Sequence, residues 1–574
     1  MASITTAPGL TGVKQGRRIE LQFILMTILF AGVAFMVITP MWQILTQSFQ
    51  VSKPGEAARW GLDGWKAVFG ETALQKAALN TVTLSVVRMV FSLTGAIFIA
   101  WLLARTDVPG AKIFEFVFWL AFFLPALTIT LSWILVLDPQ FGLLNQLLRG
   151  FKEGNGPFNI YSFAGIVWVH VMGTSLAVQV MILTPAFRNM NSAYEEASRI
   201  SGASTMGTML RIFVPLMMPA IVAVMMLSFL RSLEAFEIEQ ILGTPIGLYV
   251  FSTWIYDTLY QHIPRYDAVS ALAIVMIILC TGLIFIQRRV IGSRQYTTVT
   301  GQFVSSPIRL GKLRIPVALF LGLMCVVIIG VPMVFSVMGT FMKLFGFFIA
   351  EPWTLKQWET ALKDRLLARA IGNTITLAVS TAIVAIIVHS LIAYVIVRTR
   401  YVARGALDFL TWMPFTIPGI ILSLGLLTMF LQPQFRPMYG TMPTLVIALV
   451  ISGMPFAVQI MKSNLMQLSR DLEEASWVSG GSWLYTFRRV VLPLISPTLV
   501  VVGVISFISS ARNISQVALL SNTSIRPMSI MQLDYIAEGK YEVAAVIATI
   551  LLFMSVILAL VARVFGYRGV GTNQ

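Results

Sequence analysis

The sequence has little charge and almost no cysteine or histidine. Of its 574 residues only 11% are charged, whereas soluble domains carry about 25%. With 57% hydrophobic residues, no stretch is polar enough to cover a soluble domain, so the composition excludes a soluble enzyme and a disordered regulator. Cys280 and Cys325 both lie in apolar runs, which argues against a disulfide framework and a cysteine metal site. The composition is that of a polytopic membrane protein.

The chain also lacks an ATP-binding loop and a cleavable signal. No G-x-x-x-x-G-K-[ST] motif occurs, because Gly311-Lys312 is followed by leucine and lacks the upstream glycine. We therefore expect that the chain does not hydrolyse ATP by itself and binds no cofactor. Lys14, Arg17 and Arg18 precede an apolar run that is too long for the hydrophobic region of a signal peptide, so we interpret this run as a first membrane span.

Long apolar segments recur along the whole chain. Crossing roughly 30 Å of hydrocarbon takes about 20 mainly apolar residues, and twelve segments meet this requirement. They are 21–45, 78–103, 113–137, 162–185, 212–231, 268–287, 315–340, 371–397, 407–431, 442–462, 490–511 and 543–564. The predicted fold class is an all-α membrane protein of twelve transmembrane helices. Because twelve is even, both ends of the chain are predicted on one side.

The net charge of +16 indicates which side that is. With a cytoplasmic N-terminus, nearly all of the excess positive charge falls in the cytoplasmic loops and the two tails, as the positive-inside rule requires. The long basic loop 288–314 is then cytoplasmic too. Because the basic residues are scattered through short loops between apolar segments, we exclude nucleic acid as a partner and expect the lipid bilayer instead.

The sequence contains an internal repeat. EEASRISGASTMGTMLRIFVPLMMP at 195–219 recurs as EEASWVSGGSWLYTFRRVVLPLISP at 473–497. Other identical pairs precede these segments: Trp65/Trp358, Asn80/Asn373, Thr81/Thr374, Arg105/Arg398 and Pro125/Pro418. The chain is therefore predicted to consist of two homologous six-span halves. Since six is even, the halves have the same orientation and are related by an axis along the membrane normal.

Both copies of the repeated stretch lie in a predicted cytoplasmic loop between the fourth and fifth spans of a half. Two glutamates begin each copy, where carboxylates complement a helix N-terminus. Gly202 and Gly480 follow at a position suited to ending that helix, and a second, amphipathic stretch leads to Pro215 and Pro493. The pattern predicts a helix–turn–helix at the membrane surface, in two copies that suit docking onto a symmetric partner.

These loops resemble a known family. Glu-Ala-Ala-x3-Gly-x9-Ile-x-Leu-Pro is the cytoplasmic signature of permease subunits of binding-protein-dependent ABC importers. The chain reads EEASRISGA…RIFVPL and EEASWVSGG…RVVLPL, with Ser in place of the second Ala in both copies. Val214 replaces the usual Leu, and Gly481 stands where the first copy has Ala203. The resemblance covers 78–287 and 371–564.

In that family the loop forms a coupling helix that sits in a groove of the ATP-hydrolysing subunit. The ATPase-coupling residues implied by the resemblance are Glu195, Glu196, Ala197, Gly202, Glu473, Glu474, Ala475 and Gly480. The resemblance also implies an ABC ATPase dimer on the cytoplasmic side and an external solute-binding protein as partners, with no catalytic residue in this chain. A simpler alternative is that the glutamates only cap helices and the glycines only turn the chain.

The fused, two-half form is similar to the ferric-iron subgroup of the family, found in the bacterial plasma (inner) membrane. A small organic solute such as thiamine, a phosphonate or a polyamine is the alternative substrate. The expected domains are an N-terminal span and external loop (1–77), a first permease domain (78–287), a cytoplasmic linker (288–314), a seventh span with its loop (315–370), a second permease domain (371–564) and a tail (565–574).

Ionisable residues at membrane depth are candidates for the pathway. SFLRSLEAFEIEQIL at 228–242 corresponds to SFISSARNISQVALL at 506–520, which aligns Glu234 with Arg512. We predict an external gate formed by Arg231, Glu234, Glu237 and Arg512, with Glu239 close by. The alternative is that the segment is simply the hydrated end of a span. No metal site is expected, because strong ligands in the pore would hinder release.

The remaining polar residues of the spans are sparse. His170 and His389 are interpreted as packed polar residues, His262 is placed in an external loop, and Arg88 either faces the bundle or reaches the surface. The prolines expected to kink their helices are Pro125, Pro414 and Pro418. A proton-coupled secondary transporter, which would need a buried titratable relay, is the first rival. A membrane-embedded enzyme is the second, and three scattered histidines argue against it.

Overall fold

The computed structural model describes residues 15–51, 58–150, 154–191, 193–261, 264–292, 308–348 and 352–570. These residues form a helical bundle, apart from a small antiparallel sheet of β1 (Gln50–Val51) and β2 (Arg59–Trp60). Within them, eight helices are long and apolar enough to cross a membrane, and up to 12 spans result if each of four bent helix pairs counts as one. The predicted all-α membrane fold is confirmed. His262 and residues 293–307 lie outside the described residues.

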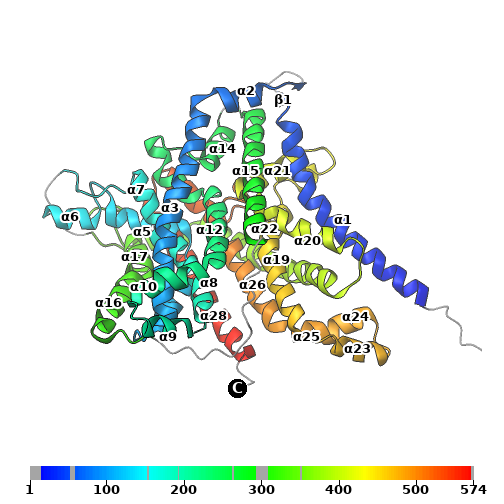
Figure 1. The fold of residues 1–574 in the computed structure, drawn as a ribbon. Coiled ribbons are helices and arrows are strands. Elements are labelled where there is room, and N and C mark those ends of the chain that lie inside the picture. The colour runs from blue at the N-terminus through cyan, green and yellow to red at the C-terminus, as the bar shows by residue number, and fades with distance from the viewer. Residues whose placement is uncertain are drawn as a thin grey trace, which may run out of the picture.

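The first half runs from α1 to α15. Its helices are α1 (Gln15–Gln47), α2 (Asp63–Gly70), α3 (Thr72–Arg105), α4 (Ala111–Ala121), α5 (Ala126–Leu137), α6 (Leu143–Arg149), α7 (Phe163–His170), α8 (Leu176–Arg188), α9 (Ala193–Ile200), α10 (Thr205–Thr208), α11 (Val214–Leu216), α12 (Met218–Leu233), α13 (Glu237–Leu242), α14 (Phe251–Leu259) and α15 (Tyr266–Gly292). Figure 1 shows α3, α12 and α15 running side by side through its centre.

The second half repeats this order from α16 to α28. Its helices are α16 (Arg314–Cys325), α17 (Val331–Thr340), α18 (Lys356–Lys363), α19 (Arg365–Arg398), α20 (Arg404–Trp412), α21 (Gly419–Phe430), α22 (Met442–Gln467), α23 (Asp471–Val478), α24 (Trp483–Thr486), α25 (Leu492–Leu494), α26 (Ser496–Ala511), α27 (Met528–Ala537) and α28 (Tyr541–Val570). α3 and α19 have 34 residues each, and α12 and α26 have 16 each, as expected for repeat equivalents.

Four of the predicted spans are broken rather than continuous. α4 meets α5 at 106° and α20 meets α21 at 109°, and the second helix of each pair begins directly after Pro125 or Pro418. Proline lacks a backbone N–H and clashes with the preceding turn, so it ends a helix and can start the next one. The predicted kinks at Pro125 and Pro418 are confirmed as full breaks, whereas Pro414 lies in a short 3-10 turn just before the second break.

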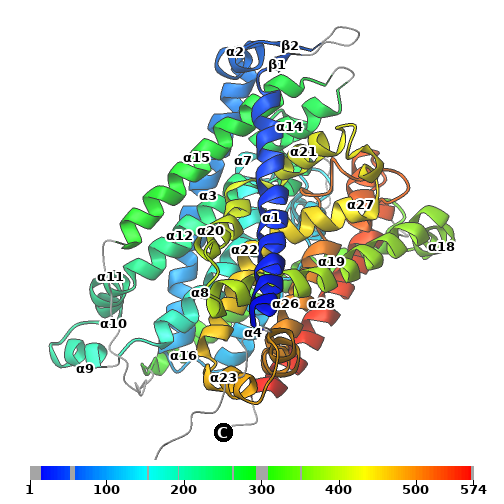
Figure 2. The ribbon, with the colours of Figure 1, turned by 90° about the vertical axis from the view of Figure 1, so that its right-hand side faces the viewer.

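The first helix of each half packs against the opposite half. α1 lies along α21, and α17 lies along α5. Gly425 of α21 permits a close approach, because a Cβ there would lie 2.8 Å from the carbonyl oxygen of Pro40. On the other side, Ser132 Oγ donates to the Pro332 carbonyl oxygen at 2.9 Å. Figure 2 shows α1 crossing in front of the second half, and one continuous apolar core links both halves.

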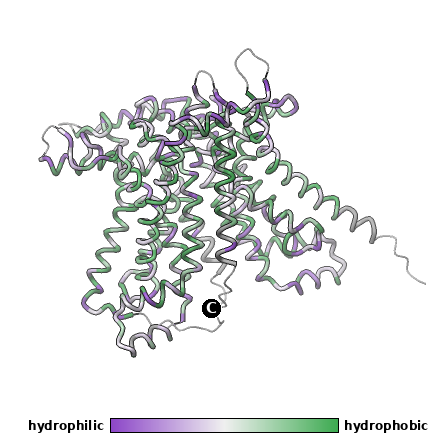
Figure 3. The backbone as a smooth tube through the Cα atoms, turned by 45° about the horizontal axis from the view of Figure 1, so that its top comes forward, coloured by the Kyte–Doolittle hydropathy of each residue, from purple (hydrophilic) through white to green (hydrophobic). Residues whose placement is uncertain are grey.

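The surface of the bundle is apolar at middle height and polar at the ends. Figure 3 shows hydrophobic residues along the long helices and hydrophilic residues gathered in the terminal turns and loops. α1 exposes a row of large apolar side chains, among them Phe23, Ile24 and Ile28. An apolar belt of this kind is matched to lipid rather than to water.

The end of the inter-half linker is fixed to the first half. Ile308 pairs with the turn after α3 through backbone hydrogen bonds to Arg105 and Asp107. Arg314 Nε donates to the Asp107 carbonyl oxygen at 3.1 Å, and the Leu310 N–H donates to the Asp107 carboxylate at 2.9 Å. The second half therefore starts from a defined position beside α4.

Candidate functional site

The two repeated loops form short helices at one end of the bundle, here named the loop end. α9 and α23 lie at the lower edge of Figure 1 in different halves, and Figure 2 places them at the same end. Two residues after the end of each helix stands a glycine with left-handed backbone, Gly202 at φ 76° and Gly480 at φ 84°. Left-handed backbone favours glycine because it lacks a Cβ. The predicted helix–turn–helix is thus present in both copies.

Serine side chains close both turns in the same way. Ser204 and Ser482 cap the next helix by accepting a backbone N–H, from Gly207 and Tyr485 respectively. Inside the turn, Ser198 Oγ lies 2.8 Å from Thr208 Oγ1, and at the equivalent position Ser476 Oγ lies 2.9 Å from Thr486 Oγ1. The serine that replaces the family's second alanine therefore ties the two helices of each loop together.

The first glutamate of the second copy is an internal anchor. Glu473 is 4% exposed, its Oε1 lies 3.1 Å from Arg398 Nε, and its Oε2 accepts from the Tyr394 hydroxyl at 2.8 Å. Both partners belong to α19, so Glu473 joins the loop to a transmembrane helix. The side chain of Glu195, its repeat equivalent, lies outside the described residues. Because it is buried, Glu473 presents no exposed carboxylate at the loop end.

The other predicted coupling residues are exposed at the loop end. This group consists of Glu196, Ala197, Gly202, Glu474, Ala475 and Gly480. Large apolar side chains surround them at matching positions of the two copies: Tyr194 and Leu472, Ile200 and Val478, Met206 and Leu484. Ile200 is 88% exposed and Val478 is 90% exposed. Exposed apolar side chains thus stand at equivalent positions of the two copies, a feature that the motif alone did not reveal.

A second group of predicted residues lies where the halves meet. Arg231 Nη1 lies 3.7 Å from Glu234 Oε2, and the Arg231 guanidinium stands over the rings of Phe415 and Phe456 at 5.6 and 5.4 Å. Arg231 belongs to the first half and the two rings to the second. This cation–π contact therefore crosses between the halves.

Arg512 makes the reverse crossing. Its Nη1 donates to the Phe122 and Leu124 carbonyl oxygens at 2.8 and 3.0 Å, in the break between α4 and α5 of the first half. Glu237 accepts from Ser515 Oγ at 3.2 Å. Glu234 and Arg512, which the repeat aligns and which belong to the predicted gate, do not form an ion pair among the described residues. Arg512 binds the unpaired carbonyl oxygens of the helix break instead. Glu234 lies near a different cation, Arg231, three residues earlier in the chain.

Behind these residues, the first half contains a buried polar network. Arg88, which is 5% exposed, donates through Nε to Ser232 and through Nη1 to His170, whose Nδ1 is 2.9 Å away. His170 Nε2 lies 2.7 Å from Glu239 Oε1, and Arg88 Nη1 lies 3.8 Å from that oxygen. Arg88 therefore faces the bundle. His170 bridges a cation and an anion, by donating from Nε2 and accepting at Nδ1.

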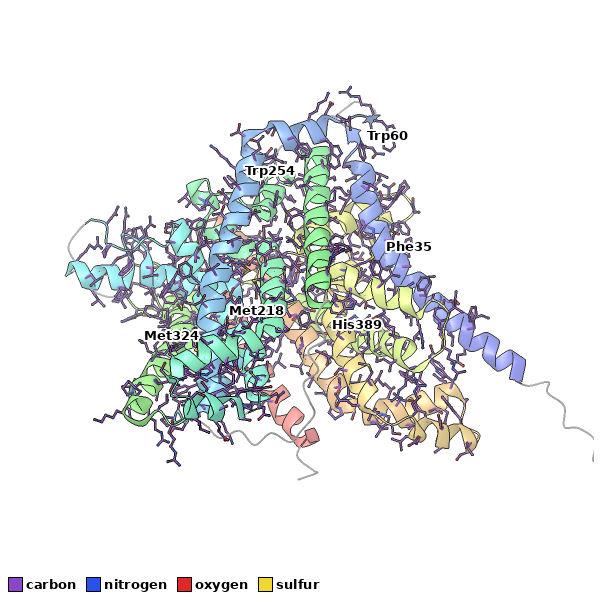
Figure 4. All side chains as sticks on the ribbon, viewed as in Figure 1. Phe35, Trp60, Met218, Trp254, Met324 and His389 are labelled. Carbon is purple, nitrogen blue, oxygen red and sulfur yellow. The ribbon has the colours of Figure 1, made fainter. Side chains whose placement is uncertain are left out.

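The second histidine predicted within the spans contacts a backbone carbonyl oxygen. His389, labelled at middle height in Figure 4, lies 3.1 Å through Nε2 from the Val450 carbonyl oxygen, as expected of a packed polar residue. Among the described residues, no group of three or more His, Cys, Asp or Glu side chains could hold a metal ion. Sequence reasoning missed the Arg88 network because its members are far apart in the chain.

A cavity of about 480 Å³ opens at the end opposite the loops, between the start of α3 and α14. Its polar lining includes Lys76, Asn80, Tyr249 and Asp257, with Trp254, labelled near the top of Figure 4. Burial raises the pKa of the Asp257 carboxyl. The cavity has room for a small molecule or for a side chain of a partner.

Comparison with known proteins identifies relatives in transport systems. Residues 96–295 and 386–568 each match the model of the family described as "Binding-protein-dependent transport system inner membrane component". The ferric transport system permease protein FbpB of Actinobacillus pleuropneumoniae is 27% identical over 86% of this chain and 71% of its own length. The putative ferric transport system permease protein FbpB 1 of Haemophilus influenzae is 27% identical over 77% of this chain and 69% of its own.

A shorter relative carries a different substrate name. The sulfate transport system permease protein CysT of Salmonella typhimurium is 28% identical over 37% of this chain and 83% of its own length. The two matched segments of the chain together cover more than half of it, and each contains one of the repeated loops. The chain therefore belongs to the family of inner membrane components of binding-protein-dependent transport systems, as a fused permease with two family repeats, and is a transport protein rather than an enzyme.

Proposed function

We propose that this chain forms the complete translocation pathway of an ATP-driven importer and that its substrate is ferric iron. A separate ATPase dimer binds α9 and α23 on the cytoplasmic side, and an external solute-binding protein delivers the substrate at the opposite end. The exposed side chains of α9 and α23 support this best, because each half presents a glutamate and apolar side chains at equivalent positions.

The exposed half of each loop supplies the docking contact, and the buried half transmits force. Glu474, Ala475 and Gly480 contact the ATPase, while Glu473 holds the same helix to Arg398 at the end of α19. When ATP closes the dimer, the two loops approach each other, and α19 moves with the loop through this buried ion pair. The pathway then opens outward, and hydrolysis resets it inward.

The gate consists of Arg231, Glu234, Glu237 and Arg512. Their contacts cross between the halves through two ring faces, two carbonyl oxygens and one serine. Each contact must break when the halves separate, and each can re-form when they meet again. Ferric iron as the substrate rests on the two relatives that carry this name and match most of this chain. Sulfate or a small organic solute is the competing outcome.

Uptake of radiolabelled iron(III) by iron-starved cells tests the proposal. Deletion of the gene should abolish uptake, and the wild-type gene should restore it. Glu196→Ala combined with Glu474→Ala should reach the membrane but fail to restore uptake. The matched control is Glu359→Ala combined with Glu538→Ala, which removes two exposed glutamates away from the loops. Full uptake by the loop variant would refute the coupling role, and unchanged uptake after deletion would refute iron as substrate.

A further inference from the structure

Arg88 connects the two ends of one pathway turn. The turn runs from the end of α12 to the start of α13 and carries Glu234 and Glu237. On one side of the turn, Ser232 Oγ accepts a hydrogen bond from Arg88 Nε. On the other side, Arg88 Nη1 donates to His170, and His170 in turn contacts Glu239. Arg88 comes from the middle of α3, so one transmembrane helix holds both ends of the turn.

The turn held in this way faces the second half. Glu237 accepts from Ser515 Oγ at 3.2 Å, and Ser515 is its own repeat equivalent. The two turns therefore touch at the pseudo-two-fold axis. Only six residues separate Ser232 from Glu239, so fixing both to one guanidinium leaves the carboxylates between them little freedom to move. The network thereby determines where Glu237 meets the second half.

The second half lacks this network. The residues equivalent to Arg88, Ser232 and Glu239 are Thr381, Ser510 and Val517, so both charges are missing there. The second turn is held instead by neutral contacts, such as Gln516 Nε2 to Ser452 Oγ at 3.0 Å. Since the repeated helices pack in the same order in both halves, the architecture does not require charges at this position.

Buried charges are also an expensive way to gain stability. Replacing a buried ion pair by apolar residues of similar volume is often neutral or stabilising. Arg88 and Glu239 have side chains that are 5% and 1% exposed. Their presence in one half alone therefore calls for a role in fixing an arrangement.

We propose that Arg88 is a positioning residue of the pathway, which fixes the turn carrying Glu234 and Glu237 through Ser232, His170 and Glu239 and so sets the closed contact between Glu237 and Ser515. The first half thus supplies a rigid side of the gate. This inference rests on the proposed function, because it assigns the gate's positioning to one half.

Cross-linking of the closed contact tests the proposal without any substrate. Cys280 and Cys325 are first replaced by alanine, and Glu237→Cys is combined with Ser515→Cys. A protease site in the segment joining the halves then reports the cross-link, because linked halves stay together after cleavage. A short bifunctional thiol reagent should link most molecules of this parent protein, in which the Arg88 network is intact. Arg88→Met with Glu239→Leu should give a several-fold loss of linked product.

The matched control is Thr381→Val, the substitution at the position equivalent to Arg88, and it should cross-link as the parent does. His170→Leu, which removes only the neutral bridge, should also lower cross-linking if the charge-pair variant is not recovered from membranes. His170→Gln, whose amide can donate and accept as the ring does, should restore it. Equal cross-linking in the parent and in the variants that lose the network would overturn the proposal.

Uptake measured on proteins that retain Glu237, Ser515 and both native cysteines separates this inference from the proposed function. If the wild-type gene supports no iron(III) uptake while cross-linking depends on Arg88, iron as substrate is contradicted and the positioning role is supported. If the wild-type gene supports uptake while cross-linking is insensitive to Arg88, the importer stands and the positioning role fails. A positioning role further predicts that Arg88→Lys lowers the maximal uptake rate more than it changes the half-saturating substrate concentration, because a single ammonium cannot hold Ser232 and His170 together.

Discussion

The ion pair between Glu473 and Arg398 allows a quantitative prediction about the coupling loop. Their side chains are 6% and 5% exposed, respectively. Removing one partner of a buried pair typically costs about 3–5 kcal/mol, since the other charge stays buried without compensation. In Glu473→Ala, Arg398 would keep its two hydrogen bonds to the carbonyl oxygens of Leu465 and Leu468, both 2.7 Å long. We therefore expect a loss near the lower limit, about 3 kcal/mol, or about a hundredfold in the folding equilibrium.

The neighbouring glutamate provides the control. Glu474 is exposed, so Glu474→Ala should change stability by less than about 0.5 kcal/mol. Heating the detergent-purified proteins and measuring the fraction that remains monodisperse should separate the two variants clearly. Arg398→Met with Glu473→Leu should recover much of the loss, because it leaves no charge unpaired. Equal heat stability of Glu473→Ala and Glu474→Ala would refute the assignment of Glu473 as an anchor.

Three further predictions concern the backbone and the interface between the halves. Gly480→Val should destabilise the loop by about 1–2 kcal/mol through left-handed strain, whereas Gly480→Asn should cost less, and limited proteolysis of the loop will show the difference. Arg512→Ala should lower the free energy of unfolding by about 1.5–3 kcal/mol, because two carbonyls at the break between α4 and α5 lose a charged donor. Arg512→Lys should recover part of this loss, and heating the purified proteins will measure both effects. Gly425→Ala should lower heat stability by about 1–3 kcal/mol through its clash with Pro40, while Gly372→Ala, which meets nothing within 4 Å, should not.

The sequence predicted the features that depend on local pattern. The length of the apolar segments predicted the long helices. The two copies of the loop motif predicted the internal repeat and the positions of α9 and α23. Pro125 and Pro418 were expected to bend their helices, yet the breaks of 106° and 109° exceed a kink. The size of such a break depends on what caps the open carbonyls, and for the first break the cap is Arg512 of the other half. A residue so distant in the chain leaves no local signal.

Site prediction was limited in the same way. Glu473 and Glu474 are adjacent and were assigned one role, but a helix turns by 100° per residue, so one faces α19 and the other faces outward. The gate residues were predicted from their charge at membrane depth. That signal did not reveal which residues of the other half they contact. Glu234 and Arg512 were placed in one gate from alignment alone, and an acid and a base at equivalent positions need not face each other. The buried Arg88 network joins four helices and emerges only in three dimensions.

The exchange of first helices between the halves has a consequence for biogenesis. α1 packs along α21, which is synthesised much later. Roughly 370 residues separate the two helices, so at about 5–20 residues per second α1 waits roughly 20–70 seconds for its partner. During that time α1 can pack against α15 of its own half, but the face destined for α21 is turned to lipid. Truncated chains that end before α21 should therefore expose this face to membrane quality-control proteases, and the first half should not mature without the second.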